Sequence, residues 1–180
     1  MLVHATDRIS RAIEDLQFTV GEGPAVDALA TQVPVLVDDL RRPPSEIDGR
    51  WPAFRAEAQV LGVKAMFAFP IIVGPVALGS LDLYRRTPGP LGDDEVTRGL
   101  AAVDAMGSSL LASDAPRPQD PTAYPMTVHR AAGMVMVQLT SGIDEALVRL
   151  RAAAYLDGTP VTTVADDVLE GRRRFARGDA

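Results

Sequence analysis

Residues 65–84 decide the fold class, because they read AMFAFPIIV (65–73), Gly74–Pro75 and VALGSLDLY (76–84). Both long segments are rich in residues that favour β-strands, and the Gly–Pro pair between them is a turn signal. Although Pro75 has no N–H to donate to a strand ladder, the pattern predicts a β-hairpin.

Segments on the N-terminal side of this hairpin add a strand and two helices. PVLVDDL (34–40) predicts a further strand, whereas residues 24–31 and WPAFRAEAQVLG (51–62) predict helices that begin near a proline. An antiparallel sheet with scattered helices is an α+β domain.

A longer helix is predicted from Asp93 to Ser113. Its apolar positions recur as in a coiled-coil seam, at Val96, Leu100, Val103, Gly107 and Leu110. Two interpretations stay open, since so short a stripe proves no coiled coil. The helix packs on the domain's own sheet, or it forms the contact of a homodimer, which is the arrangement we predict for helix 93–113.

A proline-rich segment divides the chain. Residues 114–125 read DAPRPQDPTAYP, and these prolines favour an extended, semi-rigid spacer. We therefore expect a first domain at 1–113, a linker at 114–125 and a second domain at 126–180.

The second domain has the pattern of three amphipathic helices. Apolar residues follow helical spacing in VHRAAGMVMVQL (128–139), DEALVRLRAAAY (144–155) and TPVTTVADDVL (159–169). Ser141 with Asp144 resembles a capping box, and Thr159–Pro160 offers an N-cap residue and a proline at the first helical position. Since helices this short are not stable alone, they must pack into an all-α bundle.

Composition excludes several classes of site. The 180 residues carry a formal net charge of −6, no cysteine and two histidines, His4 and His129. Disulfides, thiol nucleophiles and covalent bilin attachment are therefore excluded, and a zinc, haem or Ser–His–Asp site would be hard to build. No apolar run approaches the roughly 20 residues of a transmembrane helix, and the N-terminus lacks a signal-peptide pattern. We expect a cytoplasmic protein that is not an enzyme and has no cofactor or metal.

The three helical segments of the second domain resemble the ANTAR domain, an RNA-binding module of bacterial transcription antiterminators. The matching positions are Ala131, Gly133, Met136, Ala146, Leu150, Arg151, Ala154, Val164 and Ala165. The resemblance implies an RNA-binding regulator of transcription antitermination, with stem-loops in nascent transcripts as its partners.

The first domain resembles the GAF domain that precedes ANTAR in many actinobacterial regulators. The segments that carry this resemblance are LQFTVGEGPAVDAL (16–29), RWPAF (50–54), FAFPIIVG (67–74) and LGSLDLYRRTPGPL (78–91). The resemblance implies a sensor for an unknown small molecule, wired to the RNA-binding output.

This GAF domain is predicted to be shortened at its N-terminus. GAF domains usually begin with a helix and a strand ahead of the segment that resembles LVHATD (2–7). Met1 would then lie inside that strand, and an unpaired sheet edge would remain near residues 1–6 or 65–84.

A glycine-rich turn, Gly21 to Pro24, precedes the helix at 24–31. Such a turn can bind anions through its backbone amides. The acidic neighbours Glu22 and Asp27 weaken that possibility, so we interpret the turn as structural.

RNA recognition requires cations for phosphates and flat surfaces for unstacked bases. The exposed flanks of the first two helices of the bundle offer cations and an aromatic ring, at Arg130, Arg149, Arg151 and Tyr155. A basic cluster beyond Gly171 would add longer-range attraction for phosphates, through Arg172, Arg173 and Arg174.

Gly133 lies in the middle of a predicted helix, where glycine costs roughly 1 kcal/mol relative to alanine. A glycine at such a place suggests close approach of another group. We expect tight packing against a second helix, with approach of RNA as the alternative.

Two features keep another function open. Ala132 stands where ANTAR domains often carry a lysine, and the outward face of the third helix is acidic, with Asp166, Asp167 and Glu170. The alternative is a GAF-type ligand-binding or dimerisation protein whose ANTAR part no longer binds RNA.

Overall fold

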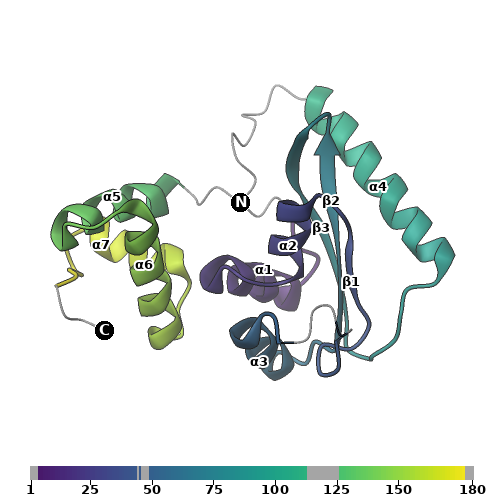
Figure 1. Cartoon of the computed structure of the whole chain (residues 1–180), viewed down its shortest axis with the longest axis horizontal. Coiled ribbons are helices and arrows are strands. Elements are labelled where there is room, and N and C mark those ends of the chain that lie inside the picture. The colour runs from purple at the N-terminus through teal and green to yellow at the C-terminus, as the bar shows by residue number, and fades with distance from the viewer. Residues whose placement is uncertain (1–3, 44, 46–48, 113–125, 177–180) are drawn as a thin grey trace. The chain divides into compact units, whose positions relative to one another are not determined.

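The computed structural model describes residues 4–43, 45, 49–112 and 126–176 (Figure 1). They form two compact units, one built mainly from the chain before residue 113 and one built mainly from the chain after residue 125. The expected linker at 114–125 lies outside the described residues.

A three-stranded antiparallel sheet lies at the centre of the first unit. Its strands are β1 (Val35–Val37), β2 (Ala65–Val73) and β3 (Val76–Arg85), hydrogen-bonded in that order. The predicted hairpin is confirmed, with Val73 paired to Val76 and Gly74 at a φ of 59° in the turn. Glycine suits this place because it adopts the left-handed conformation without a steric cost.

One face of the sheet packs against the long helix α4 (Asp93–Ala112). Phe67, Phe69 and Val103 are buried in this layer, and Val96 and Leu110 pack against it. Most of the predicted apolar stripe of α4 therefore faces the chain's own sheet.

The opposite face of the sheet is covered by α2 (Pro24–Thr31), as Figure 1 shows. Ala25 and Ala28 of α2 are buried against Ala68 of β2. Helix α3 (Pro52–Val60) buries Phe54 and Ala58, and its N-cap residue Trp51 is itself 4% exposed. All three helices agree with the sequence prediction in kind and approximate bounds.

Helix α1 (Arg8–Val20) was not predicted. Met1 was expected to lie inside a strand, but residues 1–3 lie outside the described part of the chain, and His4 to Asp7 form no strand. Asp7 and Ser10 start the helix with a capping box, in which Asp7 Oδ1 accepts from the Ser10 N–H at 2.7 Å and Ser10 Oγ accepts from the Asp7 N–H at 3.0 Å. This reciprocal pair stabilises the first helical turn.

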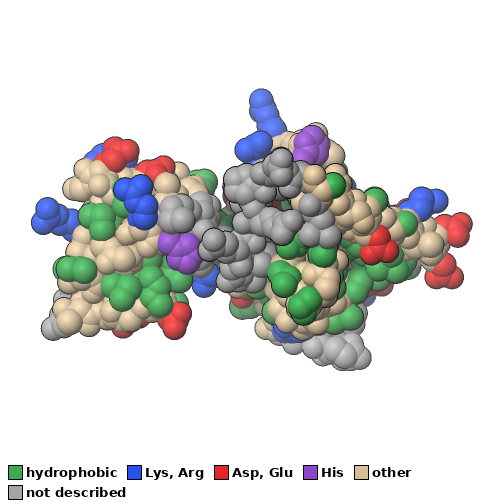
Figure 2. Space-filling view, turned by 90° about the horizontal axis from the view of Figure 1, so that it is seen from above, with side chains coloured by type: hydrophobic (Ala, Val, Ile, Leu, Met, Phe, Trp, Pro, Cys, Tyr) green, Lys and Arg blue, Asp and Glu red, His purple; other side chains and the backbone are tan. Residues whose placement is uncertain are grey.

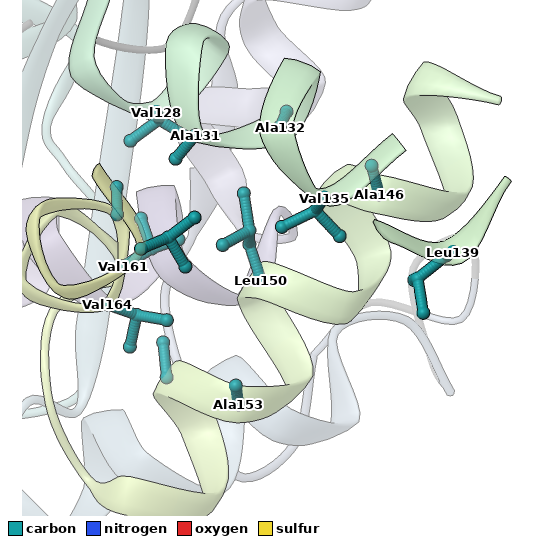
Figure 3. Packing of buried hydrophobic residues seen from close by; sticks show 13 residues of the cluster. Val128, Ala131, Ala132, Val135, Leu139, Ala146, Leu150, Ala153, Val161 and Val164 are labelled. Atoms are coloured by element: carbon teal, nitrogen blue, oxygen red, sulfur yellow. The ribbon is translucent and has the colours of Figure 1, made fainter. Parts of the chain in front are cut away.

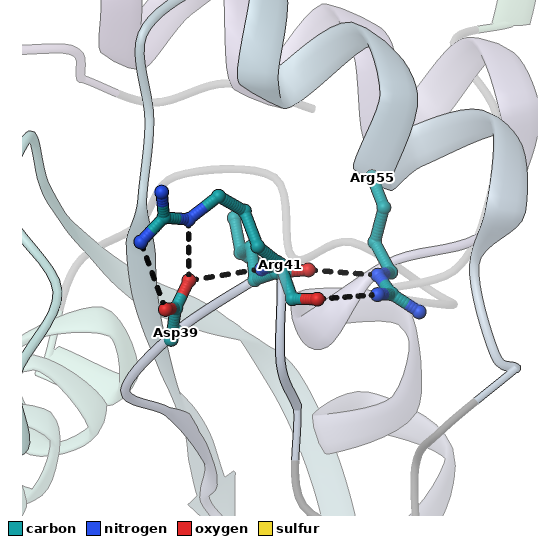
Figure 4. A network of polar contacts seen from close by, with 4 residues as sticks. Asp39, Arg41 and Arg55 are labelled. Atoms are coloured by element: carbon teal, nitrogen blue, oxygen red, sulfur yellow. Dashed lines mark hydrogen bonds and ion pairs between the residues drawn. The ribbon is translucent and has the colours of Figure 1, made fainter.

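The loop after β1 is tied to α3 by arginine side chains (Figure 4). Arg41 donates two hydrogen bonds to Asp39, both at 3.1 Å, and these bonds lower the pKa of the Asp39 carboxyl. Arg55 of α3 donates to the carbonyl oxygen of Leu40 at 2.8 Å. The loop is thereby held against the start of the domain's third helix.

The second unit is a three-helix bundle of α5 (Met126–Leu139), α6 (Ile143–Asp157) and α7 (Val161–Leu169). Its buried core consists of small and β-branched side chains with two leucines, as Figure 3 shows. The members are Val128, Ala131, Ala132, Val135, Leu139, Ala146, Leu150, Ala153, Ala154, Val161, Val164, Ala165 and Val168. The predicted apolar stripes therefore form one common core.

The expected helix caps in this bundle are wrong. The N-cap of α6 is Gly142 with no side-chain cap, and Ser141 Oγ instead donates to the Gly142 carbonyl at 3.4 Å. The N-cap of α7 is Pro160 rather than Thr159. Among the described residues, no helix is both long and apolar enough to cross a membrane.

Candidate functional site

An open groove of about 500 Å³ runs along the second unit, between α5 and the end of α7. It combines three guanidinium groups with apolar side chains and exposed glycine. The residues that line it are Arg130, Gly133, Met134, Val137, Gln138, Val168, Gly171, Arg173 and Arg174. Cations beside an apolar floor suit an anionic partner that also carries flat apolar rings.

Gly133 lines this groove and does not pack against a second helix. A Cβ built on Gly133 would meet no heavy atom within 4 Å. The expectation of tight packing against another helix is therefore wrong, since no neighbour lies close enough to require glycine. The side chains beside it, Met134 and Val137, are 39% and 81% exposed.

The chain beyond α7 is held against α5, which brings two arginines to the groove. The Phe175 N–H donates to Gln138 Oε1 of α5 at 2.8 Å, and the Phe175 ring packs on the bundle core. Arg173 lies 5.7 Å from the centroid of the same ring and forms an ion pair with Asp157 of α6. Arg173 and Arg174 thus occupy defined places rather than a frayed terminus.

The arginines differ in how far nearby acids neutralise them. Arg172 pairs with Asp167 at 2.6 Å and with Glu170, and Arg173 pairs with Asp157. Within the described part of the chain, no ion pair is found for Arg130 or Arg174, and both side chains are exposed. These two cations are the groove's strongest attraction for an anion.

The remaining predicted RNA contacts, Arg149, Arg151 and Tyr155, lie on α6 and do not line the groove. Tyr155 is 47% exposed, and Arg149 is 3.9 Å from Glu145, one turn away. Arg149 and Arg151 are half-buried rather than on an exposed flank, and burial lowers the pKa of the Arg151 guanidinium. The structure thus brings Arg130 together with Arg173 and Arg174, and it does not bring the α6 residues into the same groove.

Sequence reasoning missed Met134, Val137 and Gln138 as groove residues. Met134 and Val137 are apolar residues outside the buried stripe of α5, a pattern that could have identified them. Figure 2 shows cationic, acidic and apolar side chains interspersed on the visible face of the α5–α7 unit. On this face, charge alone therefore marks no single RNA surface.

The side chains at the glycine-rich turn make contacts within the protein, which supports the prediction of a structural turn. Glu22 Oε1 accepts from the Phe54 N–H at 2.9 Å, at the N-terminus of α3. Gln17 Oε1 accepts from the Ala25 N–H at 2.9 Å, at the N-terminus of α2. Gln17 therefore occupies the amide at the start of the helix that this turn opens, and Glu22 of the turn binds the start of α3.

The model of the GAF domain matches residues 2–109, which is more than half of the chain. The chain belongs to the GAF family. Its GAF domain comprises the sheet, α1, α2, α3 and most of α4, and membership implies a role in signalling or ligand binding. GAF domains often bind small molecules or dimerise.

No curated protein matches this chain. One solved structure similar to it is a type II free methionine-R-sulfoxide reductase from Thermoplasma acidophilum, at 13% sequence identity and a TM-score of 0.38. The likeness covers 49% of this chain and 56% of that chain. A likeness this distant carries no argument about activity.

Proposed function

We propose that this GAF protein is a signal-responsive RNA-binding regulator of transcription antitermination. In this proposal the GAF domain receives the signal, and the α5–α7 bundle is an ANTAR domain that holds stem-loops of a nascent transcript so that a terminator does not form. The protein acts in the cytoplasm, where transcripts are made, and it catalyses no reaction and needs no cofactor.

The observation that carries this proposal is the groove of the bundle. Arg130 and Arg174 supply exposed cations for phosphates, and the apolar floor at Met134 and Val137 offers a surface for an unstacked loop base. Loops with unstacked bases are the usual targets of sequence-specific RNA binding. Arg149, Arg151 and Tyr155 on α6 would extend the contact to a neighbouring part of the RNA.

The proposal includes a homodimer formed through helix 93–113. Leu100 and Met106 of α4 are 44% and 39% exposed, although the rest of the apolar stripe faces the sheet. A groove of about 430 Å³ also runs beside α4, lined in part by Leu83, Leu91 and Ala102. Pairing of two chains would present two bundles to paired stem-loops.

A second candidate function is supported by the ion pairs of the bundle. Arg172 forms ion pairs with Asp167 and Glu170, and Arg173 forms one with Asp157. Much of the positive charge of the basic cluster is therefore neutralised within the chain. In this candidate the protein is a GAF-type ligand-binding or dimerisation protein whose bundle binds no RNA.

Crosslinking of the full chain to cellular transcripts, followed by sequencing of the bound RNA, separates the two candidates. The proposal predicts enrichment of leader segments with adjacent stem-loops. A double variant, Arg130→Ala with Arg174→Ala, should lose this enrichment, while Arg42→Ala in the GAF domain serves as a matched control for the loss of a surface arginine. Recovery of the same RNA by wild type and double variant would contradict the assignment of the groove.

A further inference from the structure

The side chain of Gln17 fills a polar slot in the GAF domain, between α2 and β3. Its amide oxygen accepts from the Ala25 N–H at 2.9 Å, and its amide nitrogen donates to Asp82 Oδ2 at 2.9 Å. Gln17 is 2% exposed. A primary carboxamide therefore sits in the slot with both of its ends hydrogen-bonded.

The walls of this slot are built from small residues. A Cβ on Gly23 would lie 2.6 Å from Gln17 Oε1, and Gly23 has a φ of 138°. Both the steric contact and the backbone conformation therefore favour glycine at this position. Asp82 pairs across the sheet with Ala68, against which Ala25 packs. Gly23, the Ala25 N–H and Asp82 therefore surround the Gln17 carboxamide.

Asp82 has acceptor capacity that Gln17 does not use. Its Oδ1 atom is buried and makes no hydrogen bond of ordinary geometry, although the Ser80 side chain lies close enough to lower the pKa of this carboxyl. A buried carboxylate oxygen without a partner is costly for a purely structural contact. A ligand with a second donor beside its amide would satisfy this oxygen, which Gln17 leaves unpaired.

The helix that carries Gln17 is weakly attached to its own domain. Helix α1 packs less extensively on the sheet than α2 and α4 do, and its one large apolar residue that is fully buried is Ile13. Just before α1, the Tyr84 hydroxyl of β3 donates an exposed hydrogen bond to Asp7, at 2.6 Å. Local opening of such an element costs less free energy than unfolding of the domain.

We propose that this slot is a binding site for small molecules with a primary carboxamide, and that Gln17 is the chain's own displaceable occupant. A ligand amide accepts from the Ala25 N–H and donates to Asp82 in place of Gln17. Ligand binding then releases α1 from β3, and the displacement of this helix is the signal that the slot is occupied. No covalent step is involved.

Acetamide is the probe, because it is the end group of the glutamine side chain. In Gln17→Ala, acetamide should raise the midpoint of thermal unfolding and shift the NMR signal of the Ala25 N–H. Acetate and N,N-dimethylacetamide, neither of which has an N–H to donate to Asp82, should do neither. A folded Gln17→Ala protein whose Ala25 signal responds equally to all three probes, or to none, would overturn the proposal.

Wild-type protein provides a test that does not depend on the variant's folding. Acetamide should accelerate hydrogen exchange of the α1 amides several-fold while exchange in α4 stays unchanged, and N,N-dimethylacetamide should not have this effect. Equal acceleration in both helices would show general destabilisation and would contradict displacement of Gln17.

Discussion

Replacement of Gly133 by alanine should stabilise the bundle and weaken RNA binding at once. The added methyl group meets no heavy atom within 4 Å, so the substitution carries no packing cost in the free protein. Alanine in a helix interior is favoured over glycine by about 1 kcal/mol, which should raise the unfolding midpoint of a small unit by roughly 4–8 °C. Hydrogen exchange of the α5 amides reports this gain for the bundle alone.

The same methyl group projects into the groove where we place RNA. It should weaken binding of a stem-loop recovered by crosslinking by roughly tenfold, or about 1.4 kcal/mol, as measured by fluorescence anisotropy. Slower exchange combined with weaker binding is a signature that general loss of structure cannot produce. Unchanged affinity in Gly133→Ala would show that RNA does not approach this face of α5.

Gly99→Ala is the matched control, since Gly99 also lies inside a helix. There the new Cβ would lie 2.8 Å from Cζ of Phe69, a ring that is fully buried. Overpacking costs roughly 1–3 kcal/mol, which offsets or exceeds the gain in helix propensity. The GAF domain should therefore become less stable or stay unchanged, opposite to the bundle, and a clear stabilisation by Gly99→Ala would refute the steric argument.

Three further predictions concern pH, assembly and the α6 surface. Burial raises the pKa of Asp82 above its unfolded value of about 3.9, so the folded protein binds this proton more tightly than the unfolded chain does. The free energy of unfolding should therefore fall as the pH rises from the unfolded pKa to the folded pKa. Asp82→Asn should therefore raise the unfolding midpoint at pH 7 and reduce the decline above pH 4, and an unaltered pH profile would argue against an enclosed carboxyl. Light scattering should give twice the chain mass for wild type and the single mass for Leu100→Glu; a wild-type monomer at tens of micromolar would contradict the dimer. Arg151→Ala should weaken stem-loop binding by roughly 1–3 kcal/mol, whereas Asp167→Ala, which frees Arg172, should leave it unchanged or tighter; the reverse pattern would place RNA on the other face.

The elements with strong periodicity or clear turn residues were predictable from the sequence. The hairpin around Gly74 follows from a β-rich run on each side of a turn, and the bundle core follows from helical spacing of alanines and valines. Both signals are local, and burial of the apolar face enforces them.

The helix starts were harder to predict, because several short polar residues compete for each cap. The capping box expected at Ser141 is absent, whereas one exists at Asp7 and Ser10, where no helix was predicted. The spacing of Asp7 and Ser10 carried a signal for this helix start that the sequence analysis did not use.

The candidate site was predictable only in part, because it depends on tertiary placement. Arg130 and the arginines at 173–174 are far apart in sequence and share a groove only because the Phe175 N–H is bonded to Gln138. The ion pairs of Arg172 and Arg173 likewise depend on where α6 and α7 end. No pattern in one segment could reveal either arrangement.

The salt dependence of stem-loop binding tests the central claim most directly. Affinity of the full chain for a recovered stem-loop should fall steeply with salt, since phosphate contacts release counterions. The double variant Arg130→Ala with Arg174→Ala should bind more weakly and reduce the slope of log affinity against log salt by about 2, one for each lost contact. Identical slopes and affinities for wild type and double variant would contradict the account.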